Sequence, residues 1–513
     1  MKHRSLKRIL AALLSLVMLL AFAACSGTET AKQDDSANTR FLNLAANFAY
    51  PSLDTHKEYY GWYTSIYGIT EGLFKLGDDM SIQPVLAEKC EANGNEWIIT
   101  LKDGIKFSNG NPVTAAMVIK NIQRLASVNE RFSYFGEYTY KYVDDKTFSI
   151  FCPEVYPILP NDLASPEFGI LDLDSITDFN KAIIGTGPFV IKEFVPEGDV
   201  TVEKNANYWG GEVKLDGAKF FYMQEDEPKL LAMQSGEIQG YDSVTADAYE
   251  IFKQDPSKYA LTDIPGTRLQ FYILNKNRLS DNVRKAINGT VDKQAIADYL
   301  KGTVSPAVGP FNTSAAYGKV NGVQKIDAAA AKALIEQDGY TMGASGIYEK
   351  DGQPLKINIA YYAARSLDTL ATLIQSQLKA IGIDSTLTVE EDPDATYIKT
   401  GDFDLALYCM IADKSGDPYY FIDSTLREGA YYDCGGFSSD ACEALINQLE
   451  HETDVAKRAE LANQIIQIAI DDNAFGYVGL FNKITCLQPG ITGYASTNPF
   501  DFYAISANTD ITA

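Results

Sequence analysis

The stretch KINIAYYAARSLDTLATLIQSQLKAIGIDSTLTV, residues 356–389, decides the fold class. Its first seven residues, 356–362, form a short apolar run that is typical of a buried strand. The segment that follows predicts a helix of 3.6-residue period that ends at Gly382, because apolar residues recur at positions 367, 370, 373, 374, 378 and 381. Residues 383–389 then alternate as a second strand. A strand, a helix and a strand in this order form a βαβ unit, and the sequence therefore predicts an α/β fold.

Short strands and helices alternate on both sides of this unit as well. Residues 40–48 predict a strand, and residues 96–110 predict a hairpin that turns at its central Asp-Gly pair. Helices are expected over 112–126, with Thr114 as the N-cap, and over 327–340. The α/β pattern thus extends over the whole chain.

Composition excludes two broad classes of protein. The chain has 513 residues, of which 46% are hydrophobic, and this is enough apolar surface to exclude intrinsic disorder for its bulk. The 44 Lys and Arg residues against 68 Asp and Glu residues give a net charge of −24. Such an acidic surface argues against nucleic acid as a partner, because phosphate binding needs clustered basic residues. At roughly 100–200 residues per domain, the length predicts two to four structural units.

The N-terminus has the pattern of an export signal. Residues 1–24 begin with four basic side chains and continue as an apolar run that is too short for a membrane span of roughly 20 residues. The ending Phe-Ala-Ala-Cys resembles a bacterial lipobox, which implies that Cys25 carries a diacyl anchor. Residues 25–39 are small and polar and read as a flexible tether. The alternative is an ordinary secretory signal with an incidental cysteine.

Motifs for catalysis or for direct metal binding are missing from the sequence. Only His56 and His451 follow the signal segment, and the chain has no zinc-protease, serine-hydrolase, P-loop or dinucleotide-binding signature. We therefore expect neither an enzyme nor a cofactor nor a bound metal ligated by the chain. Of the six cysteines after Cys25, Cys434 and Cys442 are closest in sequence, and either a disulfide or free thiols would suit an exported protein.

Seven blocks of sequence resemble the family-5 extracellular solute-binding proteins of ABC importers, which include oligopeptide-, dipeptide- and nickel-binding proteins. The blocks follow one another in the family's order, and the resemblance that they carry extends over nearly the whole chain after the signal segment. They are residues 53–91, 101–125, 184–194, 202–211, 230–240, 281–296 and 413–426.

The resemblance implies a two-lobed binding protein that closes on its ligand by a hinge. It places the first lobe at 40–265, with an inserted subdomain at about 78–184. The second lobe would be 266–482, and 483–513 would return to the first lobe. The two crossings would fall near 265–275 and 481–488.

The function that the resemblance implies is capture of short peptides for a membrane permease with its ATPase subunits. The protein would be a monomer, lipid-anchored on the extracytoplasmic face of the cell membrane, at the surface of a Gram-positive cell. In peptide-binding relatives an aspartate before an acidic-Pro pair binds the peptide's α-amine, and here Asp413 and Asp417 have that arrangement with one extra residue between them. The alternative for Asp413 is a turn or capping role.

The nickel-binding branch of the family is the main alternative. Its members hold nickel in a small organic chelator that arginines grip. Here Ser165 stands where an arginine is expected, Lys399 approximates the second one, and Tyr419 stands where a histidine would follow the acidic-Pro pair. Arg365, at the end of the expected strand 356–362, is the natural cation for an anionic ligand. A surface adhesin or a ligand-free receptor would be a third use of the fold.

Aromatic residues give weaker indications. Tyr60 and Trp62 belong to a cluster, residues 59–63, that suits either a wall for stacking a solute or core packing. Trp97 is expected in the core. Tyr208 and Trp209 are expected to pack beneath a turn, with a ligand contact as the alternative. The segment 185–188, Gly-Thr-Gly-Pro, predicts a tight turn that either lines the cleft or merely connects elements.

Overall fold

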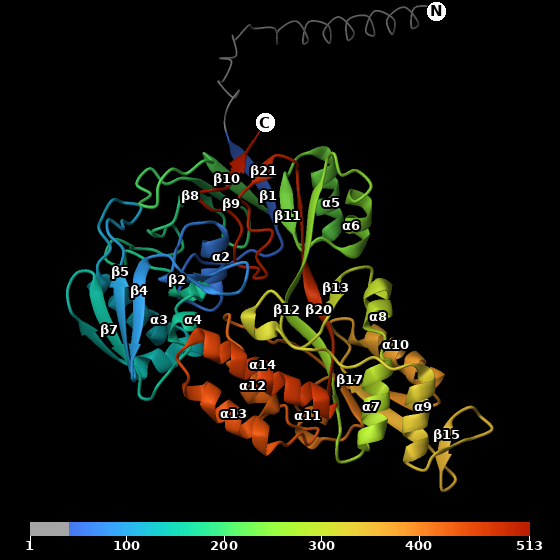
Figure 1. Cartoon of the computed structure of the whole chain (residues 1–513). Helices are drawn as coiled ribbons and strands as arrows, with labels where there is room; N and C mark the ends of the chain where they lie inside the picture. Colours follow the sequence, from blue (N-terminus) through green and yellow to red (C-terminus); the bar gives the residue numbers. More distant parts are fainter. Residues whose placement is uncertain (1–39, 513) are drawn as a thin grey trace, which may run out of the picture. The chain divides into compact units, whose positions relative to one another are not determined.

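Two long strands, β12 (Ala260–Leu274) and β20 (Phe475–Leu487), run antiparallel through the middle of an 11-stranded sheet (Figure 1). The structure is a computed structural model that describes residues 40–512. The signal segment, Cys25 and the tether lie outside the described residues.

The βαβ unit predicted from residues 356–389 is confirmed. Strand β17 (Lys356–Tyr361) pairs in parallel with β18 (Asp384–Val389), and helix α10 (Leu367–Ala380) connects them. On its other side β17 pairs in parallel with β19 (Leu405–Ile411), which in turn lies against β12. This places the predicted unit at one end of the sheet.

The strands on the other side of β20 form the opposite half of the sheet. Strand β11 (Gly240–Asp242) pairs with β20, and β1 (Phe41–Ala46) pairs in parallel with both β11 and β10 (Gly217–Tyr222). The strand expected from residues 40–48 is therefore confirmed. Strands β9 and β8 complete this end, and β13 pairs with β20 beside the main path: β8 is Phe189–Phe194, β9 Val200–Lys204 and β13 Val304–Pro306.

The pairing of β12 with β20 changes register in the middle. Residues up to Pro265 pair with the part of β20 that also carries β11, whereas pairing resumes at Leu269, where β19 has joined the other side. A bulge of this kind bends and twists a strand locally. The crossings expected near 265–275 and 481–488 fall on these two strands. The lobe boundaries drawn from the sequence remain a prediction.

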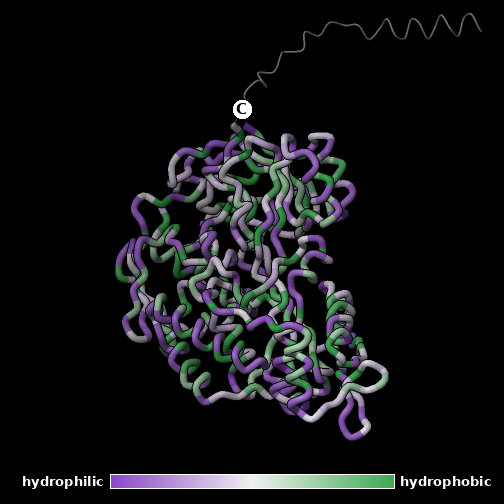
Figure 2. The backbone as a smooth tube through the Cα atoms, turned by 45° about the vertical axis from the view of Figure 1, so that its right-hand side comes forward, coloured by the Kyte–Doolittle hydropathy of each residue, from purple (hydrophilic) through white to green (hydrophobic). Residues whose placement is uncertain are grey.

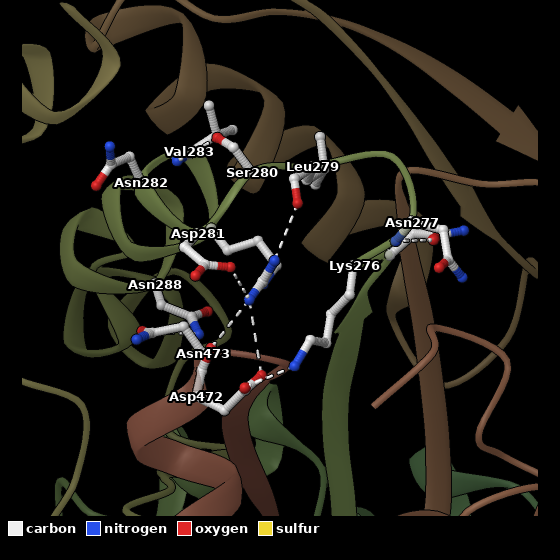
Figure 3. A network of polar contacts seen from close by, with 12 residues as sticks. Lys276, Asn277, Leu279, Ser280, Asp281, Asn282, Val283, Asn288, Asp472 and Asn473 are labelled. Carbon is white, nitrogen blue, oxygen red and sulfur yellow. Dashed lines mark hydrogen bonds and ion pairs between the residues drawn. The ribbon is translucent and has the colours of Figure 1, made fainter. Parts of the chain in front are cut away.

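A polar network around the buried Arg284 holds the segments that flank the two long strands (Figure 3). Arg284, whose side chain is 2% exposed, donates to the Leu279 carbonyl at 2.9 Å and lies 3.7 Å from the Asp472 carboxylate. Lys276, just after β12, donates to the other oxygen of Asp472 at 2.6 Å. Asn288 donates to the carbonyl of Phe475, the first residue of β20, at 3.0 Å. The end of β12 and the start of β20 are thereby fixed to helix α7 (Asp281–Thr290), which carries Arg284 and Asn288.

The hairpin expected over 96–110 is wrong. Strand β5 (Glu96–Leu101) forms a hairpin with the preceding strand β4 (Ala87–Asn93) instead. The physical reason is the two-residue turn Gly94-Asn95 between the paired residues Asn93 and Glu96, where Gly94 adopts a left-handed φ of +66°, a conformation that glycine accepts without steric cost. The four-stranded sheet is completed by β7 (Thr147–Phe151) and β6 (Thr139–Tyr142).

The two capped helices are confirmed. The Thr114 hydroxyl accepts from the Met117 amide at the start of α3 (Ala115–Val128), and Asp327 caps α9 (Ala328–Gln337). The other helices are α2 (Tyr60–Ile66), α4 (Leu159–Asp162), α5 (Asp226–Ser235), α6 (Ala246–Phe252), α7 (Asp281–Thr290), α8 (Lys293–Tyr299), α11 (Tyr397–Thr400), α12 (Tyr419–Leu426), α13 (Asp440–His451) and α14 (Val455–Asp472), with 3₁₀ turns at Glu130–Glu137, Pro166–Phe168 and Ala316–Gly318.

Hydrophobic side chains from strands and helices form the buried core, while hydrophilic residues prevail in the outlying loops (Figure 2). Trp97 is 5% exposed within the largest core cluster, as predicted. None of the helices in residues 40–512 is both long and apolar enough to cross a bilayer. The remaining short strands are β2 (Phe74–Leu76), β3 (Ile82–Pro84), β14 (Thr341–Met342), β15 (Tyr348–Lys350), β16 (Gln353–Pro354), β21 (Ile491–Thr492) and β22 (Asp510–Ile511).

Candidate functional site

The loop after β19 carries Asp413, the expected amine anchor. Its carboxylate is 1% exposed and accepts from the Tyr317 hydroxyl and, at 2.6 Å, from the Gly416 amide. Burial raises the pKa of Asp413 to about 7, although the hydrogen bonds from Tyr317 and Gly416 act in the opposite direction. Both carboxylate oxygens thus have donors within the chain. This is the geometry of a residue that orders its own loop.

The same loop contacts the opposite side of the molecule. The Asn161 amide donates to the carbonyls of Ser415 and Gly416 at 2.9 and 3.0 Å. A Cβ on Gly416 would lie 2.6 Å from the Met80 carbonyl oxygen. Residue 416 must therefore be glycine, both for its φ of +71° and for this close approach. The contact joins segments that the sequence assigns to different lobes.

Asp417 is occupied by an ion pair. The guanidinium of Arg458, on α14, binds both of its oxygens, with distances of 2.8 to 2.9 Å. The Asp417 carboxylate also accepts from the Tyr419 amide at 2.8 Å and so opens helix α12. A two-point pair between buried groups is a strong interaction. Asp417 is therefore held by the protein itself, and a role for it in binding solute remains a prediction.

Arg365 is exposed at the junction of β17 and α10. Its backbone and that of Ser366 are left-handed, with φ values of +55° and +57°, a strained conformation for residues other than glycine. The Arg365 carbonyl accepts from the Gln270 side-chain amide at 2.7 Å. The strained turn thereby brings Arg365 against β12.

A second arginine, Arg268, lies on the same face of β12 as Gln270, because alternate residues of a strand point the same way. Its side chain forms a hydrogen bond with the thiol of Cys409 on β19. Burial raises the pKa of Cys409 to about 11, while the charges of Arg268 and Arg365 both act to lower it. The two arginines therefore gather around one point of the sheet.

Neither arginine has an acidic partner at ion-pair distance among residues 40–512, whereas the other described arginines from Arg124 onward all form salt bridges. The carbonyl oxygen of the Gln270 side chain, at 0% exposure, also has no hydrogen-bond partner in this part of the chain. Tyr362, at the end of β17, donates to the Cys409 carbonyl at 3.3 Å and closes the group. We name Arg268, Gln270, Tyr362 and Arg365 the arginine site.

The aromatic cluster 59–63 divides between two surroundings. Trp62 packs on Phe502 with ring centroids 5.4 Å apart and on Tyr59 at 5.9 Å. Tyr60 instead meets Tyr50 edge-on at 5.4 Å. Both Tyr60 and Trp62 are half-buried. Of Tyr60 and Trp62, the two residues predicted to form a wall for the solute, only Trp62 therefore packs against the C-terminal segment 483–513.

A further ion pair lies beside Trp62, whose side chain forms a hydrogen bond with Glu167. Arg131 donates to the buried carboxylate of Glu167 at 2.7 Å and stacks on Tyr59, with 4.4 Å between the guanidinium carbon and the ring centroid. Burial raises the pKa of Glu167, against the charge of Arg131. Arg131 is thus paired, in contrast to Arg268 and Arg365.

Tyr419 is directed to its own helix. Its hydroxyl donates to Asp423 at 3.2 Å and accepts from Arg427 at 3.4 Å. The structure thus brings Asp413, Asp417 and Tyr419 into one loop and helix start, whereas Arg365 lies with Arg268, which pairs with Ile411 just before that loop. The six residues predicted to bind solute are thus located in the structure. Their roles in binding remain predictions.

Arg268 and Gln270 were not among the site residues predicted from the sequence. A signal existed in the strand itself, since polar residues at positions 268 and 270 interrupt the apolar run of β12. Within residues 40–512 the six cysteines are free, Cys434 and Cys442 included, and no group of three or more His, Cys, Asp or Glu could hold a metal.

Comparison with known proteins places the chain in a family. Residues 81–433 match the family model of the bacterial extracellular solute-binding proteins, family 5. The nickel-binding protein NikA of Staphylococcus aureus is 27% identical over 86% of this chain and 89% of its own length. The dipeptide-binding protein DppE of Bacillus subtilis is 26% identical over 83% of each chain.

The fold is shared with a solved structure. A nickel ABC transporter protein from Bacillus halodurans superposes with a TM-score of 0.86 at 24% identity, over 92% of this chain and all of the other. The expected two-lobed α/β architecture is confirmed by this likeness. The chain belongs to the family-5 extracellular solute-binding proteins of bacteria.

Proposed function

We propose that the chain captures a small carboxylate-bearing solute at the arginine site and delivers it to the permease of an ABC importer. The carrying observation is that Arg268 and Arg365 lie together and that neither forms a salt bridge in the described part of the chain, although the charge of Arg268 acts on the buried Asp501. Two neighbouring cations repel each other, and an anion between them relieves that repulsion. A planar guanidinium binds a carboxylate through two parallel hydrogen bonds.

Nickel held in a carboxylate-bearing chelator is the member of this solute class that we favour. Two observations support it: the likeness to nickel-binding relatives, and the lack of a protein metal cluster within residues 40–512, which suits a metal that arrives already chelated. In this arrangement the arginines bind the chelator and leave the metal to it. Tyr362, beside the two arginines, would add a flat face.

A short peptide is the second candidate. The dipeptide-binding relative supports it, and the peptide's C-terminal carboxylate would occupy the same arginines. Its α-amine would then need a carboxylate such as Asp413. Since Asp413 is 1% exposed and its carboxylate already accepts from Tyr317 and Gly416, a peptide's amine would reach it only if this loop opened. This requirement is why the chelate is preferred.

Calorimetric titration of the purified protein decides between the candidates. The solutes are nickel alone, nickel with histidine, free di- to pentapeptides and their N-acetylated forms. We expect binding of nickel only together with histidine, and a loss of roughly ten- to hundredfold in Arg365→Ala and in Arg268→Ala, since a charge-assisted hydrogen bond is worth about 1.5–3 kcal/mol. Arg278→Ala is the matched control, because Arg278 is an exposed arginine paired with Asp402.

The outcomes separate cleanly. Binding of free peptides but not of N-acetyl peptides, with the difference erased in Asp413→Asn, would establish the peptide candidate and the role of Asp413. Unchanged affinity in both arginine variants for every solute that binds would remove the arginine site from the proposal.

Anchoring completes the proposed function. A diacyl group on Cys25 would hold the protein at the extracytoplasmic face of the cell membrane, as a monomer beside the permease and its ATPase subunits. The lipobox-like sequence before Cys25 and the polar residues 25–39 support this.

A further inference from the structure

A large cavity lies away from the arginine site. It has a volume of about 1050 Å³, and its walls come from the end of α2, the β2–β3 hairpin, the turn at 208–210 and the C-terminal segment 493–508. No residue between 266 and 482 lines it, so it shares no wall with Arg268, Gln270, Tyr362 or Arg365. Small-molecule sites occupy about 300–1,000 Å³, and this cavity is at the upper end of that range.

Glu71 is the half-buried acid of this cavity. One of its carboxylate oxygens accepts from the Tyr208 hydroxyl at 2.8 Å, and the other accepts from the Trp209 indole N–H at 2.9 Å. Both donors are neutral, and Glu71 forms no ion pair within residues 40–512. Burial raises the pKa of the Glu71 carboxyl, although the hydrogen bonds from Trp209 and Tyr208 and the charge of Lys102 act in the opposite direction.

The hydrogen bonds fix both aromatic rings against this carboxylate. The expectation that Tyr208 and Trp209 merely pack beneath a turn therefore leaves out their polar ends, which both point at Glu71. Aromatic faces attract cations, most strongly that of tryptophan. A carboxylate flanked by two such rings is complementary to an organic ammonium group, which can pair with the acid while its carbon chain lies on the rings.

The other charged residues that line the cavity do not form an ion pair with Glu71. Lys102 is the cation next to the site, with its ammonium 5.8 Å from the Trp209 ring centroid, but it donates to the Pro84 carbonyl rather than to Glu71. Asp78 accepts from Thr497 and Asn498, and Lys75 and Asp79 are exposed. Three acids against two lysines leave the lining with an excess of negative charge.

We propose that this cavity is a second binding site, specific for a small organic cation with a primary ammonium group, in which Glu71 is the counter-ion and Trp209 and Tyr208 are the contact faces. The site is independent of the solute that the arginine site takes. Its occupant would connect the β2–β3 hairpin to the C-terminal segment.

Amine binding is tested by calorimetry with diaminobutane and phenethylamine, against butanediol and phenylethanol as neutral analogues of matched shape. We expect saturable binding of one amine per chain at concentrations of about 1 mM or below, and none of the neutral analogues. Glu71→Gln keeps the shape and removes the charge, and should weaken binding at least tenfold. Asp247→Asn, at an exposed carboxylate paired with Lys301, is the matched control.

Lys102→Met supplies a test of opposite sign. Removing the competing cation should strengthen amine binding several-fold, and this variant decides the matter if Glu71→Gln fails to fold. A local readout is available because the chain has three tryptophans. The fluorescence response to the amine should persist in Trp62→Phe and vanish in Trp209→Phe.

Three results would overturn the site: no saturable amine binding, equal affinity of Glu71→Gln and the unaltered protein, or an unchanged affinity in Lys102→Met. Amine binding should also survive in Arg268→Ala. Loss of nickel–histidine binding in that variant while amine binding remains separates this site from the proposed function, so that either can fail alone.

Discussion

Arg458 holds Asp417 through three hydrogen bonds between two side chains that are 5% and 8% exposed. The same guanidinium donates to the carbonyls of Leu449 and Glu452, which end helix α13. One buried cation therefore connects the loop after β19, the end of α13 and the start of α14. Asp417, which belongs to a ligand-binding motif by its sequence, is thus paired with Arg458 within the protein.

Removing either partner should destabilise the protein severely. Asp417→Asn leaves a buried guanidinium without its counter-charge, and breaking such a pair costs about 3–5 kcal/mol. Denaturant unfolding followed by circular dichroism measures this loss. Asp247→Asn, which breaks an exposed pair with Lys301, should change the free energy of unfolding by less than about 1 kcal/mol. Equal effects of the two substitutions would contradict the structural role of Asp417.

Replacement of Gly185 tests how closely two backbone segments pack. A Cβ at this position would lie 2.2 Å from the Ile69 carbonyl oxygen, closer than any real contact, and the obstacle is backbone. Gly185→Ala should therefore destabilise the protein by about 1–3 kcal/mol, as expected for overpacking. Gly136→Ala is the control, since nothing lies within 4 Å of a Cβ there. Thermal unfolding of the two variants gives the comparison, and a tolerated alanine at 185 would refute the close approach.

His56 predicts a dependence of stability on pH. The ring is fully buried, with one nitrogen against the Gly169 carbonyl at 3.1 Å and the other against the Arg124 guanidinium at 3.0 Å. Burial, helped by the charge of Arg124, lowers the pKa of His56 from 6.5 to about 4. Between these values the unfolded chain binds a proton that the folded chain does not, so stability falls as the pH drops through this window. The contribution is roughly 3 kcal/mol, fully present above pH 6.5.

The measurement must isolate His56 from other groups. Burial raises the pKa of Asp413 to about 7 and that of Asp162 to about 6, and such shifts change stability in the opposite sense, with loss as the pH rises. The free energy of unfolding of His56→Gln and of the unaltered protein is therefore compared from pH 4 to 7. Their difference should shrink towards pH 4.

Sequence patterns predicted those parts of the fold that depend on local interactions. The βαβ unit at 356–389 and the caps at Thr114 and Asp327 follow from periodicity and from one hydrogen bond each. The hairpin at 96–110 was predicted wrongly because two turn signals competed, and the Gly-Asn turn at 94–95 directs β5 to the preceding strand. Which neighbouring strand β5 pairs with is decided by the folded structure and not by the pattern within β5 itself.

The candidate site was harder to predict, because its residues meet only in the folded chain. Arg268 and Arg365 are nearly one hundred residues apart and are joined through Gln270, whose amide reaches the Arg365 carbonyl. Asp413 and Asp417 were found by resemblance, but the residues that occupy them, Tyr317 and Arg458, come from distant segments. A sequence shows which groups are charged, and it does not show which charges are already paired.

Cys25 carries the prediction about anchoring. Cys25→Ser removes the thiol to which a diacyl group would be attached, so the protein should pass from the membrane fraction to the soluble fraction of cells. Fractionation and labelling with a radioactive fatty acid measure both effects. The control is Cys90→Ser, which changes a half-buried cysteine of the folded part and should leave the labelling intact. Membrane retention of Cys25→Ser without labelling would show that another element holds the protein.

We expect the two halves of the sheet to move relative to each other at the register change between Pro265 and Leu269 in β12. A solute that contacts both lobes stabilises the closed arrangement selectively, because only there are all its contacts made. Addition of saturating nickel–histidine, or of whichever solute calorimetry identifies, should therefore lower the radius of gyration measured by solution X-ray scattering. The double variant Arg268→Ala/Arg365→Ala should show no change at the same solute concentration, since it lacks the cations that would hold the solute. A radius that stays constant in the unaltered protein, at a concentration where calorimetry shows full occupancy, would mean that the lobes do not close on the solute.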